Sequence, residues 1–225
     1  MSNVGNRVNF IVNKMDLSGI KEILDIGSWH LGQSLEFHDI FPNANINAFE
    51  PVPNSYQLCL NNNRFPDKIS VHNLALCEFT GETKFYPVDP VKSSDPNVGA
   101  SSLLKFIPGL NGSFFNQNWV QNEITVKCST LDDWSQTYGE KIDIIWIDAQ
   151  GAELRVFKGG DRTLNDVKII FTEVGLKPYY EGHSLKKEID EYLINKGFIE
   201  IKESFELNGF DYEANTIYCK KEFMK

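Results

Sequence analysis

The stretch Ile23-Leu24-Asp25-Ile26-Gly27-Ser28 decides how the rest of the chain is interpreted. Its first four residues predict a buried strand, and Gly27 lets the backbone turn sharply directly after it. A helical stretch from Leu31 to Phe41 follows and ends at Pro42. A strand that runs through a glycine turn into a helix is the first unit of an alternating α/β fold.

The same alternation continues along the chain. Further strands are predicted at 45–49, 69–74, 123–127, 142–147, 168–174, 198–201 and 215–219, and further helices at 53–64, 130–138, 152–157 and 184–196. Repeated strand–helix–strand units imply a mainly parallel sheet with helices on both faces. Only a turn around Asn208-Gly209 joins the last two strands, so we expect them to be antiparallel. Residues 79–88 are expected to form a hairpin that includes Gly81.

Composition limits the classes of protein that fit. With 225 residues, of which 41% are hydrophobic and 24% charged, the chain can form one folded domain. It has no apolar run of about 18 residues and no secretory signal, so we expect no membrane partner. A net charge of −9 argues against a nucleic-acid partner. Four widely spaced cysteines favour reduced thiols and a cytoplasmic location over zinc or disulfides.

Residues 87–122 interrupt the alternation. This stretch is rich in Pro, Ser, Asn and Gly, yet it also contains Phe106, Phe114, Phe115 and Trp119. We therefore expect a single domain over residues 1–225 with a loop-rich insertion at about 87–122. The aromatic side chains either form a lid over the acceptor of the reaction or pack as a satellite core under a long loop.

Acidic residues follow several of the predicted strands. In open α/β sheets, ligands bind beyond the carboxyl ends of the strands, where the strand order reverses. Glu50 lies at the end of the second strand, 25 residues after Asp25. A carboxylate there can accept two hydrogen bonds from a ribose diol. The pair therefore favours a cofactor that contains a nucleoside, although Asp25-x-Gly27 alone fits a structural turn equally well.

The glycine loop indicates which nucleoside-containing cofactor fits the sequence. Residues 27–32 lack the Gly-x-Gly-x-x-Gly spacing that places a pyrophosphate on a helix N-terminus, and the chain has no phosphate-binding Gly-Lys-Ser/Thr loop. S-adenosylmethionine contains no phosphate, and Asp25 can help to hold its amino-acid end, directly or through water. This cofactor, with S-adenosylhomocysteine as product, fits better than a dinucleotide.

At this point the sequence resembles the FkbM family of methyltransferases, from about Ile23 to Gly197. The resemblance rests on six segments in the same order: residues 24–28, 48–51, 73–76, 130–133, 148–153 and 171–174. It implies an α/β fold of the Rossmann-like class I methyltransferase type, with a mainly parallel seven-stranded sheet and an antiparallel C-terminal strand. It also implies S-adenosylmethionine as methyl donor and O-methylation, often of sugars or other secondary metabolites.

The resemblance also implies roles for individual residues. Asp25, Gly27 and Ser28 are expected to line the methionine and ribose side, and Glu50 to hold the ribose. Leu74 and Ala75 are expected to flank the adenine, and Asp148 to lie beside the reacting methyl group. Two positions depart from the family, which commonly has Lys in place of Trp146 and Glu in place of Gln150. The glycine loop differs too. These departures affect the acceptor and the acid–base groups more than cofactor binding.

Methylation of an alcohol needs a base to take the hydroxyl proton. The candidates are Asp148, Glu153, Glu173 and His183. Asp148 follows the most apolar strand, where burial can raise its pKa toward a useful range. The alternatives for this residue are a cap on the next helix or a contact with the cofactor.

The histidines allow further interpretations. His183 is expected to be neutral near pH 7 and able to accept a proton, or it is an ordinary surface-loop residue. His30 either faces the cofactor or lies on a turn. Asp148, Glu173 and His183 together could hold a magnesium-type ion, but no spacing motif supports this, and no metal is predicted.

The sequence thus predicts an O-methyltransferase that acts on a hydroxyl of a sugar, glycan or secondary metabolite. Two alternatives stay open. A nucleotide-dependent oxidoreductase or sugar epimerase would share the fold, but the glycine fingerprint is missing from the sequence. A non-catalytic binding module derived from a methyltransferase fits the departures at Trp146 and Gln150. The acceptor and the oligomeric state are not specified by the sequence.

Overall fold

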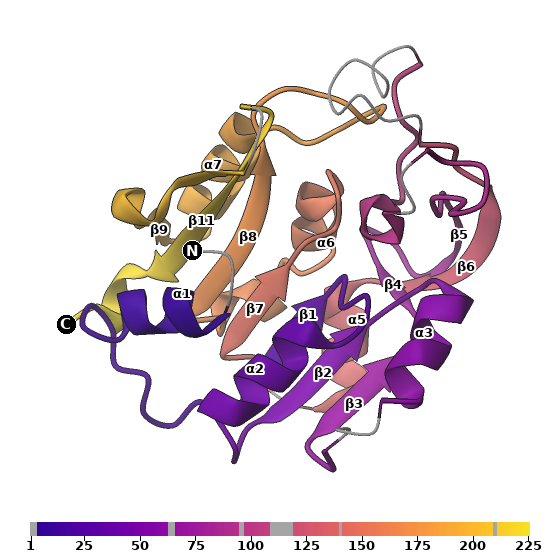
Figure 1. Ribbon diagram of the computed structural model, residues 1–225. Coiled ribbons are helices and arrows are strands. Elements are labelled where there is room, and N and C mark those ends of the chain that lie inside the picture. Colours follow the sequence, from indigo (N-terminus) through magenta and orange to yellow (C-terminus); the bar gives the residue numbers. More distant parts are fainter. Residues whose placement is uncertain (1–3, 63–65, 95–96, 109–118, 140, 209–210) are drawn as a thin grey trace.

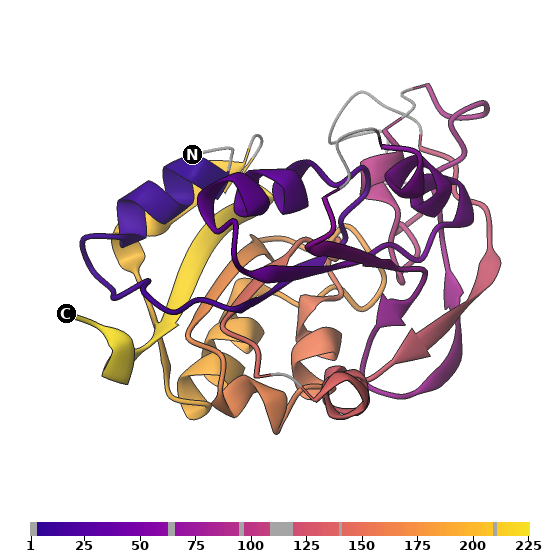
Figure 2. The same ribbon diagram turned by 90° about the horizontal axis from the view of Figure 1, so that it is seen from below.

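The protein folds into three layers. The computed structural model describes residues 4–62, 66–94, 97–108, 119–139, 141–208 and 211–225. Figure 1 shows a central sheet whose strands run across the molecule. The view from below in Figure 2 shows that helices cover both faces of this sheet. This is the α/β arrangement that the sequence predicts.

The central sheet is mainly parallel. Its strands are β1 (Glu22–Ile26), β2 (Asn45–Phe49), β3 (Ile69–His72), β7 (Ile144–Ile147), β8 (Ile169–Gly175), β9 (Phe198–Glu200), β10 (Glu206–Asn208) and β11 (Glu213–Lys220). Within the described residues their order is β10-β11-β8-β7-β1-β2-β3, with β9 also paired to β11. β11 is antiparallel to β8, β9 and β10, which confirms the predicted antiparallel C-terminal strand.

The edge of the sheet beside β11 differs from the expectation. β9 and β10 share this edge position, and a short 3-10 helix (Lys202–Ser204) separates them. The described sheet therefore has eight strands instead of seven, because its edge strand is interrupted. The connection at 208–209 follows β10 and not β9, and Gly209 itself lies outside the described residues.

The register of the central strands fixes the place of the site. Ile26 of β1 pairs with Phe49 of β2 on one side and with Ile147 of β7 on the other. The residues that follow these three, Gly27, Glu50 and Asp148, therefore leave the sheet at the same edge. The topology also reverses here, because β1 lies between β2 and β7, as expected of a ligand-binding edge in an α/β sheet.

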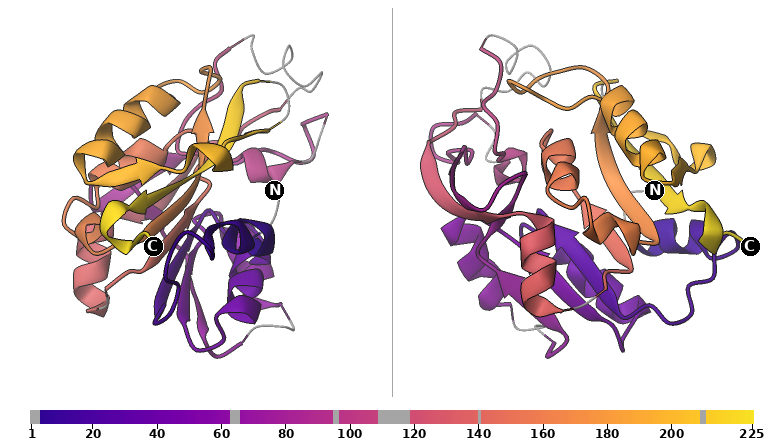
Figure 3. Two further views of the ribbon diagram at one scale, coloured as in Figure 1. Left: turned by 90° about the vertical axis from the view of Figure 1, so that its left-hand side faces the viewer. Right: turned by 180° about the vertical axis from the view of Figure 1, so that it is seen from behind.

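Helices form the outer layers. They are α1 (Val4–Ile11), α2 (Gly32–Ile40) and α3 (Pro53–Leu60) on one face and α5 (Leu131–Tyr138), α6 (Glu153–Lys158) and α7 (Lys186–Asn195) on the other. Both views in Figure 3 show the two groups on opposite sides of the sheet. The helix α5 has a polar start, since the side chain of Thr130 accepts a hydrogen bond from Asp133 N–H, and it ends at Gly139 with φ 71°.

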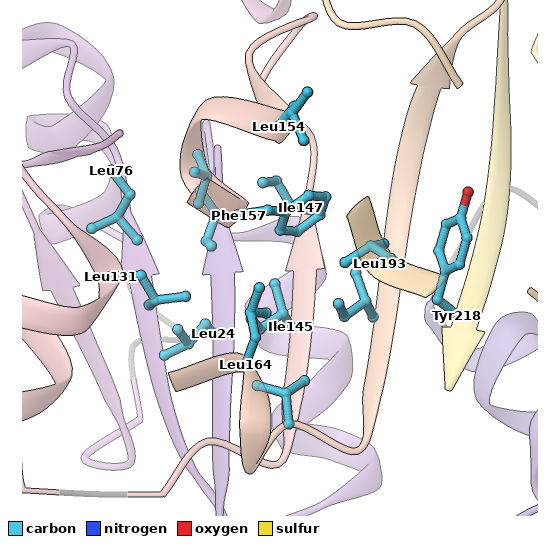
Figure 4. Packing of buried hydrophobic residues seen from close by; sticks show 14 of the residues in the cluster. Leu24, Leu76, Leu131, Ile145, Ile147, Leu154, Phe157, Leu164, Leu193 and Tyr218 are labelled. Carbon is cyan, nitrogen blue, oxygen red and sulfur yellow. The ribbon is translucent and has the colours of Figure 1, made fainter. Parts of the chain in front are cut away.

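Each face of the sheet buries its own apolar core. On the α6 and α7 face, side chains such as Phe157 and Leu193 pack against Ile145 and Ile147 of β7, as Figure 4 shows. On the opposite face, the side chains of α1 and α2 pack against Trp146 and its neighbours. Burial on both faces explains why β7 reads as a continuous apolar run.

A second, three-stranded sheet lies beside the first. It contains β4 (Ala75–Leu76), β5 (Gly81–Phe85) and β6 (Ile124–Ser129), in the order β4-β6-β5. The predicted hairpin over residues 79–88 is wrong, because β5 pairs with the distant β6. The predicted strand at 123–127 is present, but in this separate sheet. Pairing partners far apart in sequence decide both outcomes.

Local differences from the predicted elements are small. The helix expected over residues 53–64 ends at Leu60, and the strand expected over 69–74 ends at His72. The N-terminal helix α1 was not predicted; its buried face includes Val4, Val8 and Ile11. In the described part of the chain, no helix has the length and apolar character needed to cross a membrane.

Candidate active site

A crevice opens beyond the carboxyl ends of β1, β2 and β7. It contains about 600 Å³ of empty space and is open to solvent on one side. Its described lining residues include Gly27, Trp29, Glu50, Val52, Ser55, Leu74, Ala75, Val98, Gly99, Ser101, Leu103 and Asp148. Five of the seven residues predicted to bind the cofactor are among them. The insertion contributes the stretch from Val98 to Leu103.

Gly27 forms the floor where β1 meets β7. Its φ is 86°, and a Cβ atom at this position would lie 2.0 Å from the backbone oxygen of Asp148. The backbone N–H groups of Gly27 and Ser28 both donate to the carbonyl oxygen of Phe49, at 3.1 Å each. Only glycine permits this close approach, so the floor depends on it.

The loop after Gly27 has an unusual backbone. Trp29 and Leu31 adopt φ angles of 46° and 67°, in the left-handed region that side chains other than glycine rarely occupy. The indole of Trp29 lines the crevice, and its backbone oxygen accepts a hydrogen bond from Cys59 Sγ at 3.2 Å. Backbone strain of this kind concentrates at functional sites. Sequence reasoning missed Trp29, although a large aromatic residue three positions after the strand was a usable signal.

Glu50 is a buried carboxylate in the crevice wall. Its side chain is 6% exposed, and its Oε1 accepts a hydrogen bond from Val52 N–H at 2.8 Å. Burial raises the pKa of Glu50 to about 7, against the opposing effect of the N–H donors. A ligand that presents hydroxyl donors or positive charge would favour the ionised form.

Asp25 and Ser28 lie beneath the crevice floor and do not line it. Asp25 is fully buried and accepts a hydrogen bond from Ser34 Oγ of α2, and burial raises its pKa to about 6. Its Oδ1 has no hydrogen-bond partner among the described residues. Ser28 Oγ lies 3.4 Å from the carbonyl oxygen of Phe49. Their placement connects β1 to α2 and β2, and a direct contact with a cofactor stays a prediction.

A polar network surrounds Asp148. The side-chain Nε2 of Gln150 lies 2.7 Å from Asp148 Oδ1 and 3.3 Å from Glu173 Oε2. Its Oε1 lies 3.0 Å from the hydroxyl of Tyr180. Gln150 itself has φ 51°, so a strained backbone presents this side chain. Burial raises the pKa of Asp148, while the hydrogen bond from Gln150 opposes that rise.

The side chain of Glu153 holds the loop that joins β7 to α6. Oε1 of Glu153 accepts hydrogen bonds from the N–H groups of Ala149 and Gly151, at 2.9 and 3.2 Å. The helix-cap interpretation of Asp148 is wrong, because the N-cap of α6 is Ala152 and no side chain makes a capping hydrogen bond there. Glu153 is buried, which raises its pKa to about 7, and it does not line the crevice.

The two candidate histidines lie outside the crevice lining. His183 is 8% exposed, and its ring packs against Gly151 and Gly175. Burial lowers its pKa to about 4, and Tyr179 N–H lies 3.4 Å from its Nδ1. His30 is exposed and lies beside Trp29. No group of three metal-ligating side chains exists among the described residues, so Asp148, Glu173 and His183 do not come together as one.

The aromatic residues of the insertion form a satellite core. The ring of Phe106 lies between Trp119 and Tyr180, with centroid separations of 5.3 and 4.9 Å. All three are buried. For Phe106 and Trp119 this arrangement supports the interpretation as a core and not as a lid. Phe114 and Phe115 lie outside the described residues.

The electrostatic character of the crevice is one-sided. Glu50 and Asp148 line it, and none of its described lining residues is Lys, Arg or His. A pyrophosphate needs cationic side chains or a glycine-rich amide cradle, whereas two carboxylates suit a cation. The crevice therefore fits a nucleoside ligand with positive charge and without phosphate.

Comparisons of sequence agree with this geometry. Residues 27–200 match the family described as the Methyltransferase FkbM domain. The chain is also 32% identical, over 163 residues, to the 2-O-methyltransferase NoeI of Sinorhizobium fredii. That match covers 71% of this chain and 65% of the length of the relative.

Solved structures share the fold. The precorrin-6y C5,15-methyltransferase of Geobacter metallireducens superimposes with a TM-score of 0.50 and 14% identity, covering 98% of this chain and 90% of that one. The magnesium protoporphyrin IX methyltransferase of Synechocystis gives a TM-score of 0.50 at 9% identity, covering 97% and 78%. Identities this low establish the fold alone.

Proposed function

Because this chain belongs to the FkbM family of methyltransferases, we propose that it transfers a methyl group from S-adenosylmethionine to a hydroxyl group. One observation carries the proposal. The crevice at the ends of β1, β2 and β7 contains two buried or half-buried carboxylates, Glu50 and Asp148, and no cationic side chain among its described lining residues. Such a lining suits a sulfonium nucleoside and disfavours a dinucleotide.

Several residues would hold the cofactor. Glu50 would accept hydrogen bonds from the ribose hydroxyls, and Leu74 and Ala75 would flank the adenine. Gly27 would let the ligand approach the backbone closely. When bound, S-adenosylmethionine would supply a methyl group on a positively charged sulfur. The acceptor oxygen would take the methyl group, and the electron pair of the carbon–sulfur bond would stay on sulfur.

We assign the proton transfer to Asp148. It lies at the crevice wall, and the hydrogen bond from Gln150 occupies its Oδ1. Its Oδ2 is then the oxygen that would accept the hydroxyl proton of the acceptor. Glu153 does not line the crevice and His183 lies in the packing between Gly151 and Gly175, so neither is placed to reach the acceptor. Glu173 is linked to Asp148 through Gln150 and would support it.

The acceptor is proposed to be a sugar, glycan or secondary-metabolite hydroxyl. The relative from Sinorhizobium fredii is named a 2-O-methyltransferase, which supports oxygen as the methylated atom. The insertion covers one side of the crevice through Val98 to Leu103 and would separate the reaction from bulk water.

Calorimetry tests the cofactor assignment. The purified chain is titrated separately with S-adenosylmethionine and with NADH. We expect one molar equivalent of S-adenosylmethionine to bind and NADH to give no heat above dilution. Binding of NADH without S-adenosylmethionine would favour the oxidoreductase alternative. Binding of S-adenosylmethionine with no methyl transfer to any hydroxyl compound would favour the non-catalytic module.

A further inference from the structure

We infer that Tyr180 is a positioning residue for the proposed base, because its hydroxyl holds the side-chain amide of Gln150 in the orientation that donates to Asp148. This inference rests on the proposed function, in which Asp148 takes the proton, and adds a residue that lies outside the crevice. Tyr180 belongs to the connection between β8 and α7 and is fully buried. It is not among the described lining residues of the crevice, so it can influence the reaction only through its neighbours.

The amide of Gln150 has two different ends, and its surroundings decide which end faces the carboxylates. Nε2 lies 2.7 Å from Asp148 Oδ1 and 3.3 Å from Glu173 Oε2. Ionised carboxylates only accept hydrogen bonds, and the NH₂ end of the amide supplies two donors. If the amide were turned by half a rotation, its oxygen would face them instead. One of the two carboxyls would then have to be protonated in order to donate to it.

The hydroxyl of Tyr180 lies at the other end of the amide. Its oxygen is 3.0 Å from Oε1 of Gln150 and 2.8 Å from the backbone oxygen of Ala100. Both of these oxygens accept hydrogen bonds, and the hydroxyl has a single proton to donate. When Tyr180 donates to Oε1, the amide oxygen is satisfied and the NH₂ group stays on the carboxylates. The turned amide would donate to the hydroxyl oxygen, and the hydroxyl proton would go to Ala100 alone.

Packing and backbone pairing fix the position of this hydroxyl. The ring of Tyr180 is stacked on that of Phe106, with a centroid separation of 4.9 Å. Two backbone hydrogen bonds, of 2.8 and 2.9 Å, join residues 179–181 to residues 105–107 of the insertion. Tyr180 is therefore held by its ring and by its backbone, and the longer side chain of Gln150 is oriented against it.

The charges around Asp148 make its ionised form depend on this donor. Burial raises the pKa of Asp148, and the hydrogen bond from Gln150 opposes the rise. Among the described residues, the charged groups that line the same spaces as Asp148 or act on it through charge are Arg7 of α1, Asp25 of β1, Glu50 after β2, Glu153 of α6, Glu173 of β8 and Glu213 of β11. Carboxyls outnumber the one cation in this set, and like charges favour protonation. Loss of a well-directed N–H donor should therefore raise the pKa of Asp148.

The experiment measures the pKa of Asp148 by NMR and needs no acceptor. Aspartate is labelled with ¹³C at its side-chain carboxyl, and the Asp148 signal is identified by its loss in Asp148→Asn. The signal is followed against pH in the parent chain, in Tyr180→Phe and in Tyr192→Phe. Tyr192→Phe is the matched control, because it also removes a hydroxyl that donates to a backbone oxygen, that of Phe157 at 3.0 Å.

We expect the pKa of Asp148 to rise by about one unit in Tyr180→Phe, as for the loss of one hydrogen bond that favours the ionised form. It should be unchanged in Tyr192→Phe. The same pair of measurements is made in a Gln150→Met background, which keeps the length of the side chain and removes the amide. There Tyr180→Phe should have no further effect, because no amide remains for the hydroxyl to orient.

A second replacement keeps both the hydroxyl and the packing of Tyr180. Site-specific incorporation of 3-fluorotyrosine at position 180 makes the hydroxyl more acidic and therefore a stronger donor to Gln150. The pKa of Asp148 should then fall, which is the direction opposite to that of Tyr180→Phe. If Tyr180→Phe does not fold, this replacement decides alone, and the absence of a fall would overturn the inference.

Three other results would overturn the inference and leave the proposed function intact. They are an unchanged or lowered pKa of Asp148 in folded Tyr180→Phe, an equal rise in Tyr192→Phe, and an undiminished effect of Tyr180→Phe in the Gln150→Met background. Failure of the parent chain to bind S-adenosylhomocysteine in a calorimetric titration would instead refute the proposed function itself.

Discussion

The side-chain amide of Gln150 donates a hydrogen bond to the carboxylate of Asp148, with Nε2 2.7 Å from Oδ1. The same nitrogen lies 3.3 Å from Glu173 Oε2, so one neutral donor is shared between two carboxylates. The family that the sequence resembles commonly has Glu at this position. In this chain Gln150 therefore stabilises the ionised form of Asp148, which a third carboxylate would oppose.

Gln150→Glu tests this relationship. The new carboxylate would lie beside Asp148 and Glu173 and raise the pKa of Asp148 further. Because the base must be ionised, the acid limb of the plot of kcat against pH should move to higher pH. If the pKa of Asp148 rises by one unit, kcat falls about tenfold at pH values where Asp148 is mostly protonated. The loss should shrink as the pH rises and Asp148 becomes ionised in both proteins.

The matched control for this variant is Gln136→Glu, which adds the same charge on the exposed side of α5. It should leave the pH profile unchanged. If the two variants give the same profile, Gln150 does not act through the ionisation of Asp148.

Asp148→Asn separates catalysis from cofactor binding. Removal of a general base typically costs 10²–10⁴-fold in rate, so kcat should fall by about that factor. The affinity for S-adenosylmethionine should fall far less than kcat, because the amide keeps the size of the side chain and only the attraction of one carboxylate for the sulfonium charge is lost. Single-turnover rates and calorimetry give the two quantities. Equal losses in both would mean that Asp148 binds the cofactor and is not the base.

His183→Phe is the comparison variant for the base assignment. Phenylalanine keeps a ring against Gly151 and Gly175 but removes the acceptor that faces Tyr179 N–H. We expect kcat to stay within a few-fold and the free energy of unfolding to fall by about 1–3 kcal/mol, the cost of an unsatisfied buried donor. Loss of turnover with unchanged stability would transfer the role of base to His183.

Gly27→Ala should disrupt the crevice floor. Its Cβ would lie 2.0 Å from the backbone oxygen of Asp148, so the loops after β1 and β7 must separate. Gly19→Ala is a matched control, because Gly19 has a similar φ of 75° but no atom within 4 Å of the added Cβ. In both variants the left-handed backbone of the new alanine lowers the free energy of unfolding by roughly 1 kcal/mol.

Only Gly27→Ala should also lose cofactor affinity, by at least tenfold in a calorimetric titration. If both variants bind S-adenosylmethionine as the parent chain does, the close approach at Gly27 is not part of the binding site.

Cofactor affinity should depend on pH through Glu50. Burial raises the pKa of Glu50 to about 7, and the proposed ribose contact needs the ionised carboxylate. Below pH 7 the Glu50 carboxyl of the free protein is protonated, and cofactor binding must displace that proton. As the pH is lowered below 7, affinity should therefore fall by up to about tenfold per pH unit, and above pH 7 it should be constant. Glu50→Gln should bind about tenfold more weakly at pH 8 and lose most of this pH dependence.

The exposed Glu82→Gln of β5 serves as the control and should follow the parent chain. A parent affinity that does not change between pH 6 and pH 8 would contradict the assignment of Glu50 to the ribose.

The central part of the site could be predicted from the sequence. Gly27, Glu50 and Asp148 each follow a short apolar run, and strands of this kind are local features, whereas Asp25 lies beneath the crevice. The parallel register then places the ends of β1, β2 and β7 side by side, as the pairing of Ile26 with Phe49 and Ile147 shows. Local pattern and the geometry of α/β sheets were together sufficient for these positions.

Features that depend on distant contacts could not be predicted. The pairing of β5 with β6 joins segments about 45 residues apart, and no local pattern specifies it. The same holds for Arg7, whose guanidinium lies over the ring of Trp146 because α1 packs on that face of the sheet. The burial of His183 between two glycines likewise results from loop packing that its sequence neighbours do not reveal.

The most direct measurement is a crystal structure of the chain with S-adenosylhomocysteine. The account predicts the adenosyl group in the crevice, a ribose hydroxyl within hydrogen-bonding distance of Glu50, the adenine beside Leu74 and Ala75, and the sulfur on the side of Asp148. Density for the ligand at any other place, or a Glu50 side chain turned away from the ribose into solvent, would contradict it.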